Sequence, residues 1–429
     1  MPPTRTDALA ATDLPRGLIA AAIVALVWIG FQPFDTGEVV GQTAGASGGG
    51  NATNQIGFGL LGLLCVWLVT QLDAARRAAL LRPAWIVVGV LLLTATLTAD
   101  APPSAFRAAL FSAIVVLCAG VAVALPRSMD EMTATLGWGG LAALLFSLVA
   151  VFLLPEKGVH DGGGFEAQHA GLWRGVYAHK NVAAYVAGAF VILGLFVARN
   201  GRALLGLTLA GLGTLFVLGA GSKTVLGILP AALLVGWLAA RASWSPLRFI
   251  LVLLPLAILA TVTLGTALSE SANDLLQDIA PGTTFTGRLD LWRYTVEAIG
   301  KAPWGYGFES FWSTPRVTQA EQPIELSWDV RKIVHAHSSY LDAAVTFGVA
   351  GGLVLIALLT LRPAWHFARI PAKGTPNRLA EMWVTLWLFT AMGGCLESFF
   401  LRRSDPVWFA MALSLFGLQV THAMTRGRR

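Results

Sequence analysis

The feature that most constrains this chain is a series of long, uninterrupted apolar runs. Each run is roughly 15 to 22 residues long, close to the ~20 residues that a helix needs to cross the hydrocarbon core of a bilayer. A membrane β-barrel would instead show ~10-residue segments of alternating polarity. Only 13% of the 429 residues are charged, against about 25% in soluble domains. The sequence therefore predicts helices that span a membrane, and it excludes an ordinary soluble enzyme.

The runs predict an all-α, polytopic integral membrane protein with about twelve transmembrane helices. No soluble domain stands out along the chain, so residues 1–429 are expected to form a single membrane domain. No small-residue cleavage site follows the first run, which predicts a retained span instead of a signal peptide. The expected spans are 17–34, 55–72, 83–98, 105–125, 133–154, 182–198, 203–219, 225–240, 249–268, 341–361, 380–396 and 407–424.

The distribution of charge predicts which way these helices cross. If the N-terminus lies in the cytoplasm, more than half of the 30 lysines and arginines fall on the cytoplasmic side, as the positive-inside rule requires. Most of the 24 acidic residues then lie outside. We therefore expect both termini in the cytoplasm.

Two external segments are too long to be simple turns: residues 155–181, and a large loop at 269–340 between the ninth and tenth spans. A loop of ~70 residues is uncommon unless it has a structure and a function of its own. Within it Thr286 is a suitable N-cap, and apolar residues then recur at helical spacing (Leu289, Trp292, Val296 and Ile299). The sequence predicts a structured external loop, and function is expected there.

Several basic residues are expected at this external face, against the usual inside bias: Arg174, His179, Lys180, Lys223, Arg288, Arg293, His335 and His337. The planar fork of arginine matches phosphate oxygens, and lysine supplies a point charge. A lipid-linked pyrophosphate would keep its charge at this interface while its tail enters the bilayer. The alternative is that these cations pair with external acids or lipid headgroups.

A transporter usually carries ionisable residues deep inside its spans, whereas every charged residue here falls at the end of a predicted span or in a loop. His335 and His337 could be read as two metal ligands, but no third ligand stands at a convincing spacing, so no metal is expected. Glu397 lies near Arg402 and Arg403 in the last external turn. These three residues either form a mutual ion pair or contact an acceptor glycan. Four aromatic residues either stack on sugars or form an interfacial belt (Trp304, Phe308, Phe311 and Trp312).

Four motifs occur in order along the chain: WRGVYAHKN at 173–181, GSKT at 221–224, TGRLDLW at 286–292 with PWGYGF at 303–308, and HAHSSYLD at 335–342. His337 and Ser338 are followed, after nine residues, by Gly348 and Gly351. This arrangement resembles the H-[N/S/Q]-x9-G-x-x-G signature of the O-antigen ligase and polymerase family. The amino-acid sequences of the first two motifs are most similar to those of its exopolysaccharide-polymerase branch.

The resemblance implies a metal-independent glycosyltransferase without a cofactor. Such an enzyme uses an undecaprenyl-pyrophosphate-linked glycan at the periplasmic face of the bacterial inner membrane. The acceptor would be the lipid A core in a ligase or another lipid-linked glycan in a polymerase. Donor, acceptor and membrane lipids are the expected partners, and nucleic acid is not. A lipid-linked glycan flippase or another transporter is the alternative from a different functional class.

The resemblance also implies roles for individual residues. His337 matches the signature histidine and Arg288 the loop arginine, and both are expected to be catalytic. His337 would accept the proton of the acceptor hydroxyl or orient the acceptor. Lys223 stands where many members have arginine, and Ser338 where asparagine is commoner. The donor pyrophosphate is expected to be bound by Lys223, Arg288, Arg174 and Lys180, with support from His179, Asn181, Ser338, Gly348 and Gly351. The two glycines are expected to allow close helix packing.

Overall fold

The computed structural model describes residues 14–34, 52–163, 168–279, 281, 285–321 and 329–426. Within these ranges the chain folds into helices joined by loops, and extended backbone pairs only at a single bridge between Val159 and Trp173. The all-α prediction is therefore confirmed for the part of the chain that the structure describes.

Each predicted run has a corresponding helix. These helices are α2 (Leu14–Ile29), α3 (Ala52–Thr70), α5 (Pro83–Leu97), α6 (Pro102–Ala124), α7 (Met129–Leu153), α9 (Lys180–Arg199), α10 (Ala203–Ala220), α11 (Lys223–Arg241), α12 (Ser245–Ala260), α17 (Ser339–Arg369), α18 (Gly374–Gly393) and α19 (Pro406–Arg426). α12 continues to Leu268 through a π-helical turn at Thr261–Gly265 and the short α13 (Thr266–Leu268). The shorter connecting helices are α4 (Ala74–Leu80), α8 (Pro155–Gly158), α14 (Glu270–Ile279), α15 (Arg288–Lys301) and α16 (Pro315–Thr318).

The described helices include nine that are long and apolar enough to cross a membrane, or ten if the bent pair α4–α5 counts as one span. The apolar part of α2 is shorter, and α18 is not among the nine. The first turns of α18 carry Asn377, Arg378 and Glu381, which shortens its apolar part. The chain is thus a membrane protein, and the count of twelve spans stays a prediction.

Central and peripheral helices differ in how much of their surface the protein covers. In α9 and in α19, 78% of the most apolar window is buried, whereas in α3 and in the α12–α13 span the buried share is 28% and 22%. α9 and α10 approach closely because Gly206 lies against the backbone of α9. A Cβ on Gly206 would lie 2.2 Å from the nitrogen of Ala198. Small residues at helix contacts replace the hydrophobic driving force that lipid does not supply.

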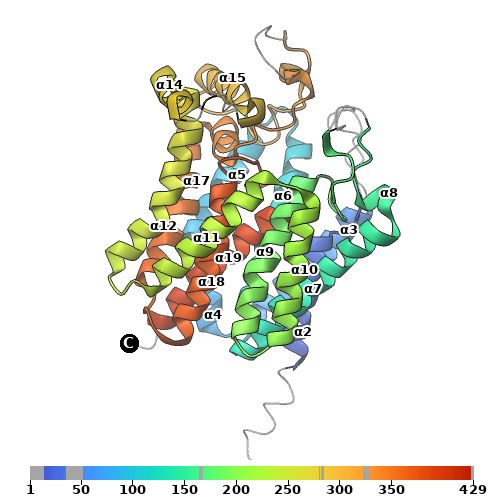
Figure 1. Cartoon of the computed structure of the whole chain (residues 1–429), viewed down its shortest axis with the longest axis vertical. Coiled ribbons are helices and arrows are strands. Elements are labelled where there is room, and N and C mark those ends of the chain that lie inside the picture. Colours follow the sequence, from blue (N-terminus) through green and yellow to red (C-terminus); the bar gives the residue numbers. More distant parts are fainter. Residues whose placement is uncertain are drawn as a thin grey trace, which may run out of the picture.

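The described part of the 269–340 segment contains α14, α15 and α16 and lies at one end of the bundle (Figure 1). α15 begins at Arg288 with Gly287 as its N-cap, so the prediction of Thr286 as the cap residue is wrong by one position. Gly287 has a φ of 80°, a conformation that glycine adopts readily. The predicted apolar face is present, because Leu289 and Trp292 are buried.

α17 is broken at Gly348, whose φ of 72° and ψ of 175° are not helical. Residues 303–308 lie in the break and replace the lost helical hydrogen bonds. The N–H of Tyr306 donates to the carbonyl of Val345 (2.8 Å), and the N–H of Val349 donates to the carbonyl of Pro303 (2.8 Å). A Cβ on Gly348 would lie 2.4 Å from the carbonyl carbon of Trp304. Gly348 therefore lies where a loop enters a break in the helix. This corrects the expectation that Gly348 allows two helices to pack closely.

α17 also runs past the predicted end of its span to Arg369. The polar residues of this extension bond to α19. Arg362 donates from Nη2 to Oε1 of Gln419 (2.6 Å), and His366 Nδ1 lies 2.7 Å from His422 Nδ1. These contacts with α19 stabilise the last part of α17, where the sequence becomes less apolar.

Candidate functional site

A buried carboxylate, Glu397, lies between α18 and α19 and collects three side chains from distant parts of the chain. Arg288 Nη2 donates to Glu397 Oε1 at 2.7 Å, and Asn181 Nδ2 donates to the same oxygen at 2.8 Å. His337 Nδ1 lies 3.0 Å from Glu397 Oε2. Only 12% of the Glu397 side chain and 11% of the Arg288 side chain is exposed. Three residues that the sequence singles out thus meet on one carboxylate.

The ends of three helices bring these side chains together. Arg288 is the first residue of α15, Asn181 is the second residue of α9, and His337 directly precedes Ser338, the N-cap of α17. The N-terminus of a helix carries a partial positive charge and unpaired N–H groups. The site therefore combines helix ends and cationic side chains around a single anion.

The backbone at His337 is held in a left-handed conformation, with a φ of 49°. The residues after it bond to the segment that carries Glu397. The N–H of Ser338 donates to Ser398 Oγ (3.0 Å), and Ser339 Oγ donates to the carbonyl of Glu397 (2.8 Å). These bonds fix the imidazole of His337 relative to the carboxylate.

His335 packs edge-to-face on His337, with ring centroids 4.1 Å apart. Its Nδ1 accepts a hydrogen bond from the N–H of His337 (3.2 Å). Burial lowers the pKa of His335 well below its ordinary value, and nearby charges from His337 and Arg402 lower it further, so the ring is neutral. Within the described ranges no three histidine, cysteine or carboxylate side chains are arranged to hold a metal ion.

The predicted lysines lie beside this cluster. Lys180 begins α9 and Lys223 begins α11, and the charges of Glu397 and Lys223 both act on Lys180. Lys180 Nζ donates to the carbonyl of Gly221 (3.5 Å), while Lys223 is exposed. Lys180, Lys223 and Arg288 carry three positive charges, of which Glu397 offsets one.

Three other predicted residues lie away from the carboxylate or have structural contacts. His179 is the N-cap of α9, where its Nδ1 accepts from the N–H of Asn181 (3.1 Å). Arg174 Nε donates to the carbonyl of Lys157 (2.9 Å), so its described contacts remain within the 155–181 segment. Gly351 lies beyond the break in α17, near Phe347 and Leu91.

The sequence did not place Glu397 among the catalytic or pyrophosphate-binding residues, and predicted for it only an ion pair or a contact with the acceptor glycan. The ion pair expected between Glu397 and Arg402 or Arg403 is absent from the described contacts: Arg402 donates to the carbonyl of Ser398 (3.1 Å), and Arg403 pairs with Glu309 (3.8 Å). The available signal was that Glu397 is an acid at the end of a span on the face where the cations gather.

The charge state of Glu397 follows from its neighbours. Burial alone would raise its pKa, but the electrostatic effects of His337 and Arg288 and the hydrogen bond with His337 outweigh burial and lower the pKa to about 2. The carboxylate is therefore ionised at any physiological pH. It can hold the Nδ1–H tautomer of His337, which makes Nε2 the basic nitrogen of the ring.

Two cavities, of about 250 and 320 Å³, are lined by other residues. Glu397, His337 and Arg288 line neither of them.

Comparison with known proteins adds one match. Residues 208–356 match the model of the O-antigen ligase family. The matched stretch contains Lys223, Arg288, His337, Gly348 and Gly351, and it ends before Glu397. No curated protein matches the chain.

Proposed function

The chain belongs to the O-antigen ligase family through residues 208–356, and from this premise we propose that it is a membrane glycosyltransferase. It would move a glycan from undecaprenyl pyrophosphate to an acceptor hydroxyl. The observation that carries the proposal is the meeting of His337, Arg288 and Asn181 on the buried carboxylate of Glu397.

The donor side of the reaction needs positive charge. When the bond between the sugar C1 and the phosphate oxygen breaks, its electron pair stays with the pyrophosphate. Cations fixed in advance near the bilayer stabilise that charge more than they would in water. In our proposal Arg288, Lys180 and Lys223 have this role, with Arg174 as a more distant contributor. The net positive charge of the cluster supports it.

The acceptor side needs a proton acceptor. The acceptor oxygen attacks C1 from the face opposite the leaving pyrophosphate, and its proton passes to Nε2 of His337. General-base catalysis of this kind is worth roughly 10² to 10⁴ in rate. Glu397 would act as a positioning residue that keeps the proton of the resting imidazole on Nδ1.

We propose that the site faces the periplasm, in a bacterial inner membrane, with both termini in the cytoplasm. The positive-inside distribution supports this orientation. The opposite placement of the 269–340 helices and of the two chain ends supports it as well: α14 and α15 lie at one end of the bundle, while α2 begins and α19 finishes at the other (Figure 1).

Purified protein given an undecaprenyl-pyrophosphate-linked glycan and candidate acceptors tests this function. The wild type should release undecaprenyl pyrophosphate, and His337→Ala should release it about 10² to 10⁴ times more slowly. Lys301→Ala is a matched control, because Lys301 lies at the same end of the molecule and pairs only at the surface with Glu297. Equal release by wild type and His337→Ala would exclude His337 from the mechanism.

The choice of acceptor separates the two activities of the family. Elongation of a second lipid-linked glycan would identify a polymerase, and transfer to the lipid A core would identify a ligase. If the protein, in vesicles, moved the intact donor across the bilayer without releasing undecaprenyl pyrophosphate, the transferase proposal would be wrong.

A further inference from the structure

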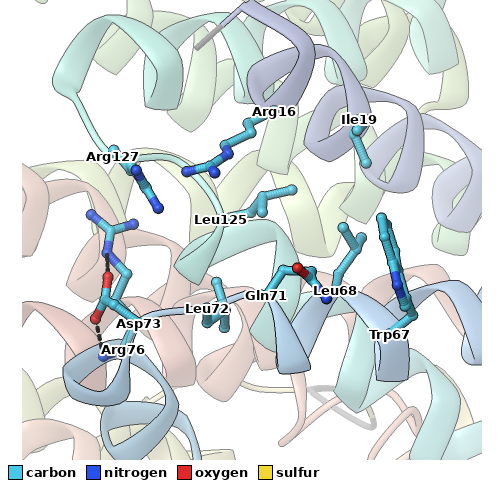
Figure 2. A pocket seen from close by; sticks show the side chains of 10 residues that line it. All are labelled: Arg16, Ile19, Trp67, Leu68, Gln71, Leu72, Asp73, Arg76, Leu125 and Arg127. Atoms are coloured by element: carbon cyan, nitrogen blue, oxygen red, sulfur yellow. Dashed lines mark hydrogen bonds and ion pairs between the residues drawn. The ribbon is translucent and has the colours of Figure 1, made fainter. Parts of the chain in front are cut away.

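A cavity of about 250 Å³ lies at the end of the bundle away from α14 and α15. Its walls come from α2, from the α3–α4 corner and from the turn between α6 and α7, as Figure 2 shows. α3 ends at Thr70, α6 ends at Ala124 and α7 begins at Met129, and all three helices are candidate spans. The cavity therefore opens where membrane helices reach the bilayer surface.

One of its three arginines is held by the protein. Arg76 Nε lies 3.3 Å from Oδ2 of Asp73, and Arg76 Nη1 donates to the carbonyl of Ala124 (2.6 Å). This guanidinium and the Asp73 carboxylate largely satisfy each other.

Arg16 and Arg127 differ from Arg76. Their guanidinium groups point toward each other across the cavity in Figure 2. No described carboxylate forms an ion pair with either side chain. The nearby acid Glu131 is buried and accepts, at Oε2, from the backbone N–H of Arg127 (2.7 Å). Two like charges that face each other repel, and an anion between them would relieve the repulsion.

The rest of the wall is apolar, with Ile19, Leu68, Leu72 and Leu125 beside the arginines. Trp67 lies at the edge and is 55% exposed, as is typical of a tryptophan at a membrane interface. A ligand that suits this wall carries a negative head and an apolar tail.

The second cavity, of about 320 Å³, provides an internal comparison. It is also lined by arginine and apolar residues, but it contains Glu381, which pairs with Arg199 (3.3 Å) and lies 3.9 Å from Arg241. There the protein supplies its own anion. At the first cavity no carboxylate in the described ranges forms an ion pair with Arg16 or Arg127, so an external anion can supply their counter-charge.

We propose that the cavity between Arg16 and Arg127 binds the phosphate of an anionic phospholipid in the adjacent leaflet. An acyl chain of this lipid runs along Ile19, Trp67 and Leu68. The bound lipid joins the first turn of α2 to the end of α3 and to the turn before α7, at the end of the protein away from the Glu397 cluster. This inference is independent of the transferase chemistry.

Lipid titration of the purified full chain in neutral detergent, followed by native mass spectrometry, tests it. The probes are dioleoylphosphatidylglycerol, dioleoylphosphatidylcholine and glycerol 1-phosphate. The wild type should bind the anionic lipid about tenfold more tightly than the zwitterionic one, and Arg16→Gln/Arg127→Gln should remove this preference. Arg199→Gln is the matched control, because it removes an arginine that already has a carboxylate partner, and it should change affinity less than about twofold.

Two outcomes of this titration would overturn the proposal. Unchanged binding of phosphatidylglycerol by the double variant would show that the lipid binds elsewhere. Glycerol 1-phosphate binding as tightly as the lipid would indicate a site for a free anion. If the double variant fails to fold, the single change Arg127→Gln at an exposed position replaces it, and a loss of affinity of less than about twofold would reject the site.

Discussion

The carboxylate of Glu397 receives Arg288 and Asn181 on one oxygen and His337 on the other. An anion in such a buried position stabilises the folded protein only while its partners are present, and a missing member leaves the others unpaired. Its position therefore links the stability of the site to the orientation of the imidazole.

Glu397→Gln keeps the size of the side chain but removes its charge. We expect turnover to fall by roughly 10² to 10⁴, because the amide no longer holds the imidazole tautomer as a carboxylate does. Release of undecaprenyl pyrophosphate measures the loss. Glu309→Gln is the control, since Glu309 pairs loosely with Arg403 at 3.8 Å on a more exposed surface. Equal loss in both variants would argue against a specific role for Glu397.

The pH dependence of stability follows from the same carboxylate. Its folded pKa of about 2 is lowered from 4.5, so its contribution is fully present above about pH 4.5 and is lost as the pH falls toward 2. Thermal unfolding in detergent at pH 6 and pH 3 should show a larger drop for the wild type than for Glu397→Gln. An identical drop in both proteins would contradict this assignment.

Sequence motifs pointed to His337, Arg288 and Asn181, because each belongs to a recognisable string of residues. Glu397 has no such string around it, and its importance arises only when the 394–405 turn folds back onto α17. Arg174 shows the reverse case. It belongs to a motif with Asn181, but the chain turns between them and directs Arg174 to the carbonyl of Lys157.

Among the helices, α17 is the one most directly connected to the candidate site. Its first half begins at the His337–Ser338 cap, and its break at Gly348 receives residues 303–308. The large loop is thereby attached to a membrane helix through backbone hydrogen bonds, which do not depend on side-chain identity.

Gly348→Ala should be much more damaging than Gly351→Ala. At Gly348 the new Cβ would meet the Trp304 backbone at 2.4 Å in a positive-φ conformation, whereas at Gly351 the nearest atom is the Cβ of Phe347 at 3.0 Å. We expect Gly348→Ala to destabilise the protein by about 1–3 kcal/mol or more. Yield of folded protein and thermal unfolding measure the difference. Equal behaviour of the two variants would contradict the structural role of the break.

Gly351→Leu tests the predicted packing role of the second signature glycine. The longer side chain must displace Phe347 or Leu91, because Cδ2 of Leu91 lies only 3.4 Å from the point that a Cβ on Gly351 would occupy. We expect the free energy of unfolding to fall by about 1–3 kcal/mol, as for other overpacked contacts, and the yield of folded protein to fall with it. Normal yield, stability and turnover would show that this glycine is not needed for packing.

Apolar runs predicted the helices well, because a backbone in lipid must satisfy its hydrogen bonds within each segment. The break in α17 could not be predicted in this way. The sequence around Gly348 is continuously apolar, and the partners that make the break possible come from a loop some forty positions earlier. The extension to Arg369 was missed for a similar reason, since Gln419 of α19 stabilises it.

At the scale of the whole molecule, α9 and α19 are enclosed, while α3 and the α12–α13 span expose most of their surface. The candidate site lies at one end of this arrangement, and the cavity with Arg16 and Arg127 lies at the other. Under the two proposals, the two ends would therefore bind different ligands at the two surfaces of the membrane.

The proposed orientation can be tested with cysteine labelling in bacterial cells. A membrane-impermeant maleimide should label Lys301→Cys in intact inner-membrane spheroplasts and Lys373→Cys only after lysis, because both positions are exposed at opposite ends. The native cysteines give a low background, since Cys65, Cys118 and Cys395 are buried. The reverse labelling pattern would place the Glu397 cluster in the cytoplasm.

The seam between residues 303–308 and the broken α17 also affects biosynthesis. The ribosome makes the PWGYGF segment after Ala95, which accepts from the N–H of Phe308, but before Val345, Thr346 and Val349, which form its bonds to α17. The loop thus emerges with its partner on α5 in place but without its partners on α17, and the seam with α17 can form only after residues 345–349 have been made. Folding of the 269–340 loop is in this way coupled to the insertion of α17, the helix that follows His337.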